Sequence, residues 1–427
     1  MFFRLKTTEE IIRIIGGLQV LDQETVPLKD AYGRILSRDV EAPEDLPGFR
    51  RSSMDGFAVR ARDTFGASES LPALLEIAGE VPMGRAPDVE VGPGQAARIA
   101  TGGMLPEGAD AVVMVEYCHK LDERTVEVAR AASPLENVIQ PNDDVRSGEK
   151  ILAQGAFLRP QDVGILPGLG LTRVKVVRRP RVAVLSTGDE VVPVDSVPGP
   201  GRVRDVNSHT LAAFCRALGA VPVSLGLVPD RFESLREKVE AGLQQADSVW
   251  ISGGSSVGTK DMTIRVMESF QGMEILAHGV SISPGKPTIL AQLAGKSVWG
   301  IPGHAASALV VAEVLLSPFI RRLAGERHWP APGPSPLQAE LSRNIESAQG
   351  RDDFIRVRLA NTGGRLIAEP LFGKSGLISP LVEADGLVRV DRFTEGLYQG
   401  EIVDVIPFHF IGAVRSPVRE GPEGGLV

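Results

Sequence analysis

Cysteine is scarce in this sequence: its 427 residues include only two, Cys118 and Cys215, and only six histidines. The two cysteines have no metal-type spacing and are too few for a disulfide framework. The histidines are scattered, so the sequence shows neither a zinc cluster nor a recognisable Ser-His-Asp order. These absences favour a reducing compartment, and we expect a cytoplasmic protein.

Aromatic residues and positive charge are also limited. Phe, Trp and Tyr make up 5% of the chain, and the formal net charge is −8. Both values argue against nucleic acid or an anionic membrane surface as a partner. No apolar run approaches the ~20 residues of a membrane span, and Glu9 and Glu10 interrupt any signal-peptide region.

The hydrophobic pattern divides the chain into regions of different fold class. Thr7 to Glu10 predicts a capping box that opens a helix. Strand and helix patterns alternate from Arg181 to Arg321, which predicts a doubly wound α/β domain with a parallel sheet. Short β-type runs predict an inserted β domain between Pro43 and Asp144. More short strands follow a proline-rich linker after Gly325, so we expect a C-terminal β domain and a disordered tail.

Glycine and serine gather at successive predicted strand ends between residues 247 and 307. Glycines let backbone N–H groups approach an oxyanion, a helix N-terminus adds partial positive charge, and Lys286 between two prolines adds a cation. Each segment alone is also compatible with an ordinary βα turn, but open α/β sheets bind ligands at this edge. We therefore predict a polyanion site formed by Gly253, Gly254, Ser255, Ser256, Gly258, Lys286, Pro302 and Gly303.

Carboxylates also follow predicted strands of the α/β domain: Asp189 and Glu190, then Asp230, then Asp261. These carboxylates would repel the phosphates of a ligand. A bound Mg²⁺ would offset this repulsion, because it binds few carboxylates and leaves positions for phosphate oxygens. The alternative is that Asp189 and Asp261 only cap helices. The residues thus predict binding of a phosphorylated, metal-associated small molecule, either by an enzyme or by a non-catalytic scaffold.

Several segments occur in the order that is typical of one known family. They read Ser53-Met-Asp-Gly-Phe-Ala, Thr101-Gly-Gly-Met-Leu-Pro-Glu-Gly-Ala-Asp, Leu185-Ser-Thr-Gly-Asp-Glu, Ser252-Gly-Gly-Ser-Ser-Val-Gly-Thr-Lys-Asp and Pro284-Gly-Lys-Pro. Over nearly its whole length, the chain resembles the molybdopterin molybdenumtransferases of the MoeA type, which are similar to the E domain of gephyrin.

The resemblance implies a multidomain α/β plus β protein around a molybdopterin-binding α/β domain at 178–327. The other expected parts are an N-terminal helix within 1–21 that packs on this domain, a small discontinuous domain at 22–42 and 145–177, the inserted β domain at 43–144, a C-terminal β-barrel-like domain at 337–412 and a flexible tail at 413–427.

The resemblance also implies the reaction, in which molybdate is inserted into adenylylated molybdopterin with Mg²⁺-dependent release of AMP. It implies an elongated homodimer, with other molybdenum cofactor biosynthesis proteins as further partners. The implied catalytic residues are Asp55, Thr101, Asp144, Glu190, Asp230 and Asp261. The implied metal ligands are Glu190 and Asp261, and Ser375 joins Lys286 and Pro302 among the substrate-binding residues.

The chain departs from the family pattern near these loops. Ser283 and Gly279 stand where many members have lysine, and His304 replaces the usual asparagine after Pro302-Gly303. These departures bear on oxyanion specificity. They leave tungstate as an alternative to molybdate, and a molybdopterin-binding scaffold as an alternative to an enzyme.

Overall fold

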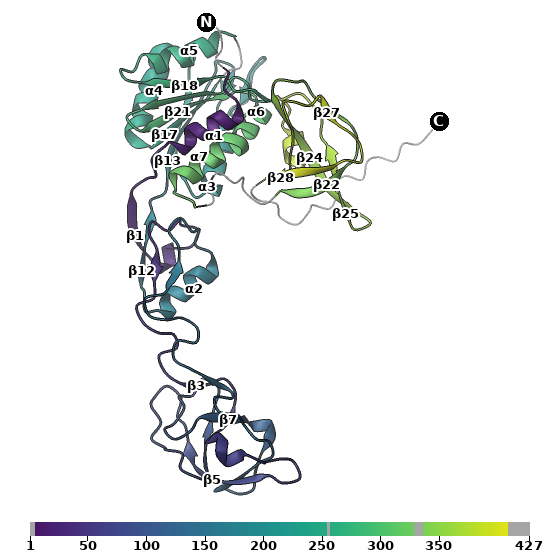
Figure 1. Ribbon diagram of the computed structural model, residues 1–427. Coiled ribbons are helices and arrows are strands. Elements are labelled where there is room, and N and C mark those ends of the chain that lie inside the picture. The colour runs from purple at the N-terminus through teal and green to yellow at the C-terminus, as the bar shows by residue number, and fades with distance from the viewer. Residues whose placement is uncertain (1–4, 254–256, 328, 330–335, 409–427) are drawn as a thin grey trace.

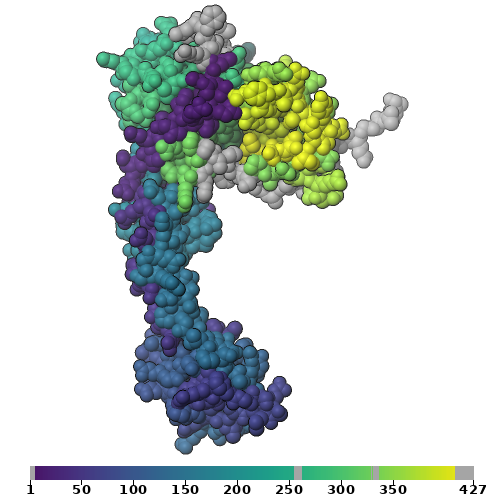
Figure 2. Space-filling view, in the orientation of Figure 1, coloured from purple at the N-terminus to yellow at the C-terminus, as the bar shows by residue number. Residues whose placement is uncertain are grey.

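The computed structural model describes residues 5–253, 257–327, 329 and 336–408, without the side chains of 257–261. The expected tail at 413–427 lies outside these residues. The chain is elongated: the α/β domain and a C-terminal barrel lie side by side at one end, and the inserted β domain forms the other (Figure 1). The space-filling view shows a narrow stalk between the two ends (Figure 2). No helix of the described part is long and apolar enough to cross a membrane.

The central domain is built on a six-stranded sheet with the order β16-β13-β17-β21-β20-β18. The strands are β13 (Arg181–Thr187), β16 (Val221–Val228), β17 (Ser248–Gly253), β18 (Glu274–His278), β20 (Ile289–Leu293) and β21 (Lys296–Pro302). Strands β16, β13, β17 and β21 pair in parallel, as the alternation of strands and helices predicts. Almost every residue of β13 and β17 is buried, because helices cover both faces of the sheet.

The helices form two sets, one on each face of the sheet. The first set comprises α1 (Thr8–Gly16), α3 (Asn207–Ala217), α6 (Ala305–Val311) and α7 (Ser317–Leu323), and the second comprises α4 (Phe232–Gln245) and α5 (Val257–Glu268). Along β13, Val182 and Val184 belong to the core under the first set, while Ala183 and Leu185 belong to the core under the second. Alternation with a period of two is what a strand buried on both faces requires. The predicted doubly wound arrangement is therefore present.

One edge of the sheet differs from the fully parallel prediction. Strand β20 pairs antiparallel with both β21 and β18. Ala294 and Gly295 alone connect β20 to β21, with φ of 49° and 81°, and so short a turn joins antiparallel neighbours. Ile289 at the start of β20 pairs with Gly300 near the end of β21. The segment before β20 therefore lies at the same edge as the carboxyl ends of β17 and β21.

A small domain connects the α/β domain to the inserted domain. Its pairs are β1 (Gln23–Pro27) with β12 (Arg173–Val177) and β2 (Val40–Glu41) with β11 (Lys150–Leu152), beside α2 (Pro160–Gly168). Each pair joins a segment before the insertion to one after it. The insertion carries β3 (Arg51–Ser52) and a sheet of β4 (Gly56–Val59), β5 (Ala73–Glu80), β6 (Gln95–Ile99), β7 (Ala111–Met114), β8 (Cys118–Lys120) and β9 (Thr125–Val128).

The C-terminal domain is a barrel that is attached to the α/β domain by backbone hydrogen bonds. Its strands are β22 (Leu337–Leu341), β24 (Asp352–Thr362), β25 (Arg365–Pro370), β26 (Gly386–Val390) and β28 (Ile402–Pro407). The pairing of β24 with β26 closes the ring. Strand β19 (Ile282–Ser283), from the α/β domain, pairs in parallel with the start of β24. The segment that leads to Lys286 is thereby part of the barrel sheet.

Candidate functional site

A cavity of about 490 Å³ lies at the carboxyl edge of the parallel strands. Its lining includes Glu190 after β13, Gly253 at the end of β17, and Gly303 after β21. The barrel contributes Gly376 and Ile378 to the same cavity. Ligands of open α/β sheets bind at this edge. The structure thus brings together three residues that the sequence predicts for the site.

Close strand packing explains the glycine at position 253. A Cβ atom there would lie 2.2 Å from Cγ2 of Thr187 on β13, far inside van der Waals contact. The lack of a side chain lets the end of β17 lie against β13 beside the cavity. The predicted residues Gly254, Ser255 and Ser256 lie outside the described part.

For residues 257–261, which follow the glycine loop, the structure describes the backbone but not the side chains. Gly258 and Asp261 lie in the first turns of α5, directly after the loop. The side chain of Asp261 is outside the described part. Its predicted role as a metal ligand therefore remains a prediction.

A group of carboxylates lies beside the cavity. The Thr187 hydroxyl donates a hydrogen bond to Asp230, and the Asp230 N–H donates to Asp189 Oδ1 at 3.3 Å. Burial raises the pKa of the Asp230 carboxyl, and the charges of Asp189 and Glu190 raise it further, although the Thr187 hydrogen bond opposes this. Negative charge is thus unfavourable here and a cation would be favourable. The described side chains alone include no group of three or more that is placed to hold a metal ion.

Asp205 and Asn207 line the cavity, although no motif marked them. The Asn207 side-chain amide donates to Ser252 Oγ and to the Gly303 carbonyl, both at 2.8 Å. Ser186 Oγ donates to Asp205 Oδ1 at 2.9 Å. These bonds tie the ends of three parallel strands to the start of α3. The sequence feature that could have identified Asp205 and Asn207 is a run of polar residues between a short strand and a helix, as in the neighbouring loops.

Lys286 is exposed at the same sheet edge, although the described lining of the cavity does not include it. It precedes β20, and the reversed direction of that strand brings it to this edge. Gly285 before it has φ of 129°, and a Cβ there would lie 2.7 Å from Ile282 Cδ1. The loop is therefore packed closely on its inner side while the lysine side chain faces solvent. Pro302, at the end of β21, is buried and shapes the strand end.

The barrel adds two polar groups, of which Ser375 contacts the α/β domain. Ser375 Oγ lies 2.7 Å from His304 Nδ1, so the predicted Ser375 does lie beside the loop that follows β21. Arg356 on β24 is only 7% exposed. Its Nη2 donates to the Gly373 carbonyl at 3.0 Å, and its Nη1 has no hydrogen-bond partner within the described residues.

Burial lowers the pKa of the Arg356 guanidinium, which means that its charge is poorly solvated. A buried cation with an unused donor is suited to bind an anion. Sequence reasoning missed this residue because Arg356 lies in an ordinary alternating strand, where only the fold shows which side chains are buried.

The remaining predicted residues lie in and beside the inserted domain. Asp55 Oδ1 accepts hydrogen bonds from the Thr101 N–H at 2.7 Å and the Thr101 hydroxyl at 2.9 Å. The backbone bond first, and then the hydroxyl bond, lower the pKa of Asp55. Asp144 is exposed where this domain meets the small domain, and its N–H donates to Leu46. Because the inserted domain lies at the far end of the chain (Figure 1), these residues do not join the cavity of their own chain.

A larger hollow of about 670 Å³ lies beside the C-terminal end of α3, next to the small domain. Arginines contribute to its lining, but Arg178 is paired with Asp247 and Arg321 with Glu326. The charges of Arg178 and Arg321 are therefore already compensated. Size alone therefore does not make this hollow the better candidate, since it lies away from the carboxyl ends of the strands.

The fold and this site define a class of protein, and comparisons with protein families agree with it. Residues 183–322 match the model described as a probable molybdopterin binding domain. Residues 5–170 match the MoeA N-terminal region (domain I and II), and residues 338–408 match the MoeA C-terminal region (domain IV). The central α/β domain is thus of the molybdopterin-binding class, in the domain context of MoeA.

Individual relatives are similar over most of the chain. A molybdopterin molybdenumtransferase of Haemophilus influenzae is 34% identical over 392 residues, which cover 91% of this chain and 95% of that one. A molybdopterin molybdenumtransferase of Bacillus subtilis is 30% identical over 403 residues, 93% of each chain. The crystal structure of the molybdopterin biosynthesis MoeA protein of Pyrococcus horikoshii OT3 superposes with a TM-score of 0.81 at 29% identity, covering 95% of this chain and 100% of that one. This chain belongs to the MoeA family of molybdopterin molybdenumtransferases, enzymes of molybdenum cofactor biosynthesis, which confirms the resemblance and the expected fold class.

Proposed function

We propose that this protein inserts molybdate into adenylylated molybdopterin and releases AMP. The observation that carries the proposal is the cavity at the carboxyl edge of β13, β17 and β21. It places glycine backbone, a carboxylate group and barrel residues around one space. A substrate with phosphates, a pterin and a metal oxyanion needs all three kinds of contact. The family membership supports the same reaction, and we place it in the cytoplasm because cysteine is so rare.

In this proposal, Lys286 and Arg356 hold the oxyanion. Because Ser283 pairs in parallel with Asp353, the two segments run in the same direction from this pair. Lys286 follows shortly after Ser283, and Arg356 follows shortly after Asp353. The two positive charges match a doubly negative molybdate. The unused Nη1 of Arg356 offers a donor that is already desolvated, which strengthens a charge-assisted hydrogen bond. Ser375 supports the barrel side of this subsite.

We assign Mg²⁺ to the acidic side of the cavity, with Glu190 and Asp261 as ligands. The raised pKa of Asp230, caused first by burial and then by nearby negative charge, fits a place that favours a cation. Mg²⁺ takes few carboxylates and completes its shell with phosphate oxygens and water. When bound, the ion would neutralise charge on the phosphates from which AMP departs. Thr187 and Asn207 keep the strand ends and Asp230 in position for this.

The Asp55–Thr101 pair enters the proposal through a second copy of the chain. Exposed apolar side chains lie near this pair: Met54 and Met104 are close to it in sequence, and Met83 lies against Gly102. Such side chains around a polar pair suit a docking surface. In a two-fold dimer, the inserted domain of one subunit completes the α/β site of the other, and the symmetry gives two such sites.

Reconstitution with competing oxyanions tests the proposed reaction. Purified protein is supplied with adenylylated molybdopterin, Mg²⁺ and equal molybdate and tungstate, and both AMP and the metal content of the product are measured. We expect AMP release together with molybdenum incorporation. Incorporation of mainly tungsten would replace the proposed substrate. Tight binding of the adenylate without AMP release would favour the scaffold instead.

A further inference from the structure

The segment at 279–281, which precedes the loop that carries Lys286 and is called the loop base here, is held by backbone hydrogen bonds from two sides. On one side, the Lys6 N–H donates to the Gly279 carbonyl at 3.1 Å, and the Ser281 N–H donates to the Lys6 carbonyl at 2.8 Å. On the other side, the Asp352 N–H donates to the Ser281 carbonyl at 2.9 Å. The loop base is therefore the middle segment between the start of α1 and the start of β24.

The base is bonded directly to the tip of the loop. The Val280 N–H donates to the Lys286 carbonyl at 2.9 Å, and the Gly279 N–H donates to the Thr288 carbonyl at 2.9 Å. The Thr288 hydroxyl donates in turn to the Gly285 carbonyl at 2.7 Å. A shift of the base relative to the barrel would therefore move Lys286 as well.

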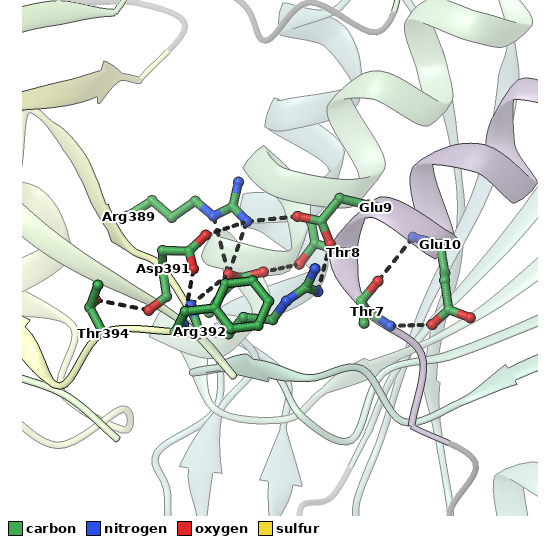
Figure 3. Close-up of polar contacts among 10 residues, drawn as sticks. Thr7, Thr8, Glu9, Glu10, Arg389, Asp391, Arg392 and Thr394 are labelled. Carbon is green, nitrogen blue, oxygen red and sulfur yellow. Dashed lines mark hydrogen bonds and ion pairs between the residues drawn. The ribbon is translucent and has the colours of Figure 1, made fainter. Parts of the chain in front are cut away.

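Side chains join the two flanking segments to each other (Figure 3). The fully buried Asp352 accepts a hydrogen bond from the Thr8 hydroxyl at 3.0 Å and from Arg389 Nη2 at 2.9 Å. Arg389 Nη2 also donates to Glu9 at 2.7 Å, and Arg392 Nη1 donates to the other Glu9 oxygen at 2.8 Å. The contacts form a closed triangle of α1, the barrel and the loop base.

The buried carboxylate of Asp352 and the ionised Glu9 stabilise the contact between α1 and the barrel only while both keep their arginine partners. A buried carboxylate is costly unless it is paired and hydrogen-bonded, so removal of one partner leaves an uncompensated charge. Burial alone would raise the pKa of Glu9, but hydrogen bonds from its own backbone N–H and from Arg389 outweigh this and lower it to about 2. Glu9 is therefore ionised throughout the neutral range, and the pairs persist there.

We propose that Thr8, Glu9, Asp352, Arg389 and Arg392 form an interdomain clamp that positions Lys286. The clamp residues act through the loop base and do not touch the substrate. The inference rests on the proposed function in one respect, namely that Lys286 binds the anionic substrate. A merely structural cluster would stabilise the domain contact without affecting the loop or its ligand.

The test compares two arginine substitutions in the full-length protein. Arg389→Met breaks the clamp. Arg358→Met is the matched control, because Arg358 also lies on the barrel, donates to Glu369 at 3.0 and 2.6 Å, and has a similar side-chain exposure of 45% against 37%. Hydrogen exchange of residues 279–288 and calorimetric affinity for molybdopterin are measured for both. Arg389→Met should raise exchange in this segment and weaken binding roughly two- to thirtyfold, the range for residues that act through packed neighbours. The control should change neither.

Lys286→Ala, measured in parallel, separates this inference from the proposed function. If Lys286→Ala weakens binding while Arg389→Met changes neither exchange nor affinity, the clamp is overturned. If exchange rises in Arg389→Met but Lys286→Ala binds as tightly as the wild type, the clamp holds the loop and the substrate role of Lys286 is wrong. Glu9→Gln provides a milder second variant with the same expected directions. A rise in exchange confined to the barrel would also overturn the clamp.

Discussion

Replacing Gly253 by alanine should destabilise the α/β domain and distort the cavity. The new Cβ would lie 2.2 Å from Thr187 Cγ2, where carbon atoms prefer about 3.5–4.0 Å. Relief requires either that β17 moves away from β13 or that Thr187 rotates out of its hydrogen bond with Asp230. Overpacking of a closely packed site costs about 1–3 kcal/mol. We expect the free energy of unfolding to fall by that amount and turnover to fall with it.

The α/β domain carries its own probes for this measurement. Trp250 on β17 and Trp299 on β21 are fully buried, so urea unfolding followed by tryptophan fluorescence reports on this sheet. Gly164→Ala is the control, since a Cβ there would meet nothing within 4 Å, and it should not destabilise the protein.

A compensating change sharpens the test. Thr187→Ser removes the Cγ2 methyl group but keeps the hydroxyl, so the double variant with Gly253→Ala should recover most of the lost stability. A wild-type unfolding midpoint for Gly253→Ala, or a double variant no more stable than the single one, would refute the steric reasoning.

Other substitutions test the charges around the site. Lys286→Ala should weaken binding of molybdopterin by about 1.5–3 kcal/mol, the range for a charge-assisted hydrogen bond, with unchanged thermal stability because Lys286 is exposed; unchanged affinity in calorimetry would reject its role. Glu190→Gln should fold but lose Mg²⁺-dependent AMP release, and wild-type rates would remove Glu190 from the site. The pKa of Asp230 in the folded protein is raised above its ordinary value of 3.8, so the ionised carboxylate lowers the free energy of unfolding. Asp230→Asn should therefore stabilise the protein at neutral pH, and this stabilisation should vanish below pH 3.8. The pKa of Glu9 is lowered from 4.5 to about 2, so its contribution is present above 4.5 and is lost as the pH falls toward 2; urea titrations of Glu9→Gln that run parallel to the wild type across this range would contradict it.

Local patterns predicted those parts of the fold that depend on neighbouring residues. The capping box of Thr7 and Glu10 is present, and the alternation after Arg181 did predict helices on both faces of a largely parallel sheet. Strand β20 and its antiparallel hairpin with β21 were not predicted, because Ala294, which adopts positive φ, is not a usual turn residue.

The site was only partly predictable for a related reason. Glycine loops and acidic loops can be identified locally, so the cavity edge was expected at residues such as Gly253 and Glu190. Arg356 and Asp352 could not be identified, because their roles come from burial and from distant partners. Thr8 and Asp352, for example, are 344 positions apart in the chain, and only the folded barrel brings them into contact.

In the proposed dimer, each site combines Asp55 and Thr101 of one subunit with the α/β cavity of the other. Chains with Asp55→Ala and with Glu190→Gln are co-expressed with different tags, the mixed dimer is purified, and its AMP release is compared with that of each homodimer. Both homodimers should be inactive. The mixed dimer should recover about half of the wild-type activity, because symmetry places both lesions in one site and leaves the other intact. A verified, folded mixed dimer without activity would contradict the composite site.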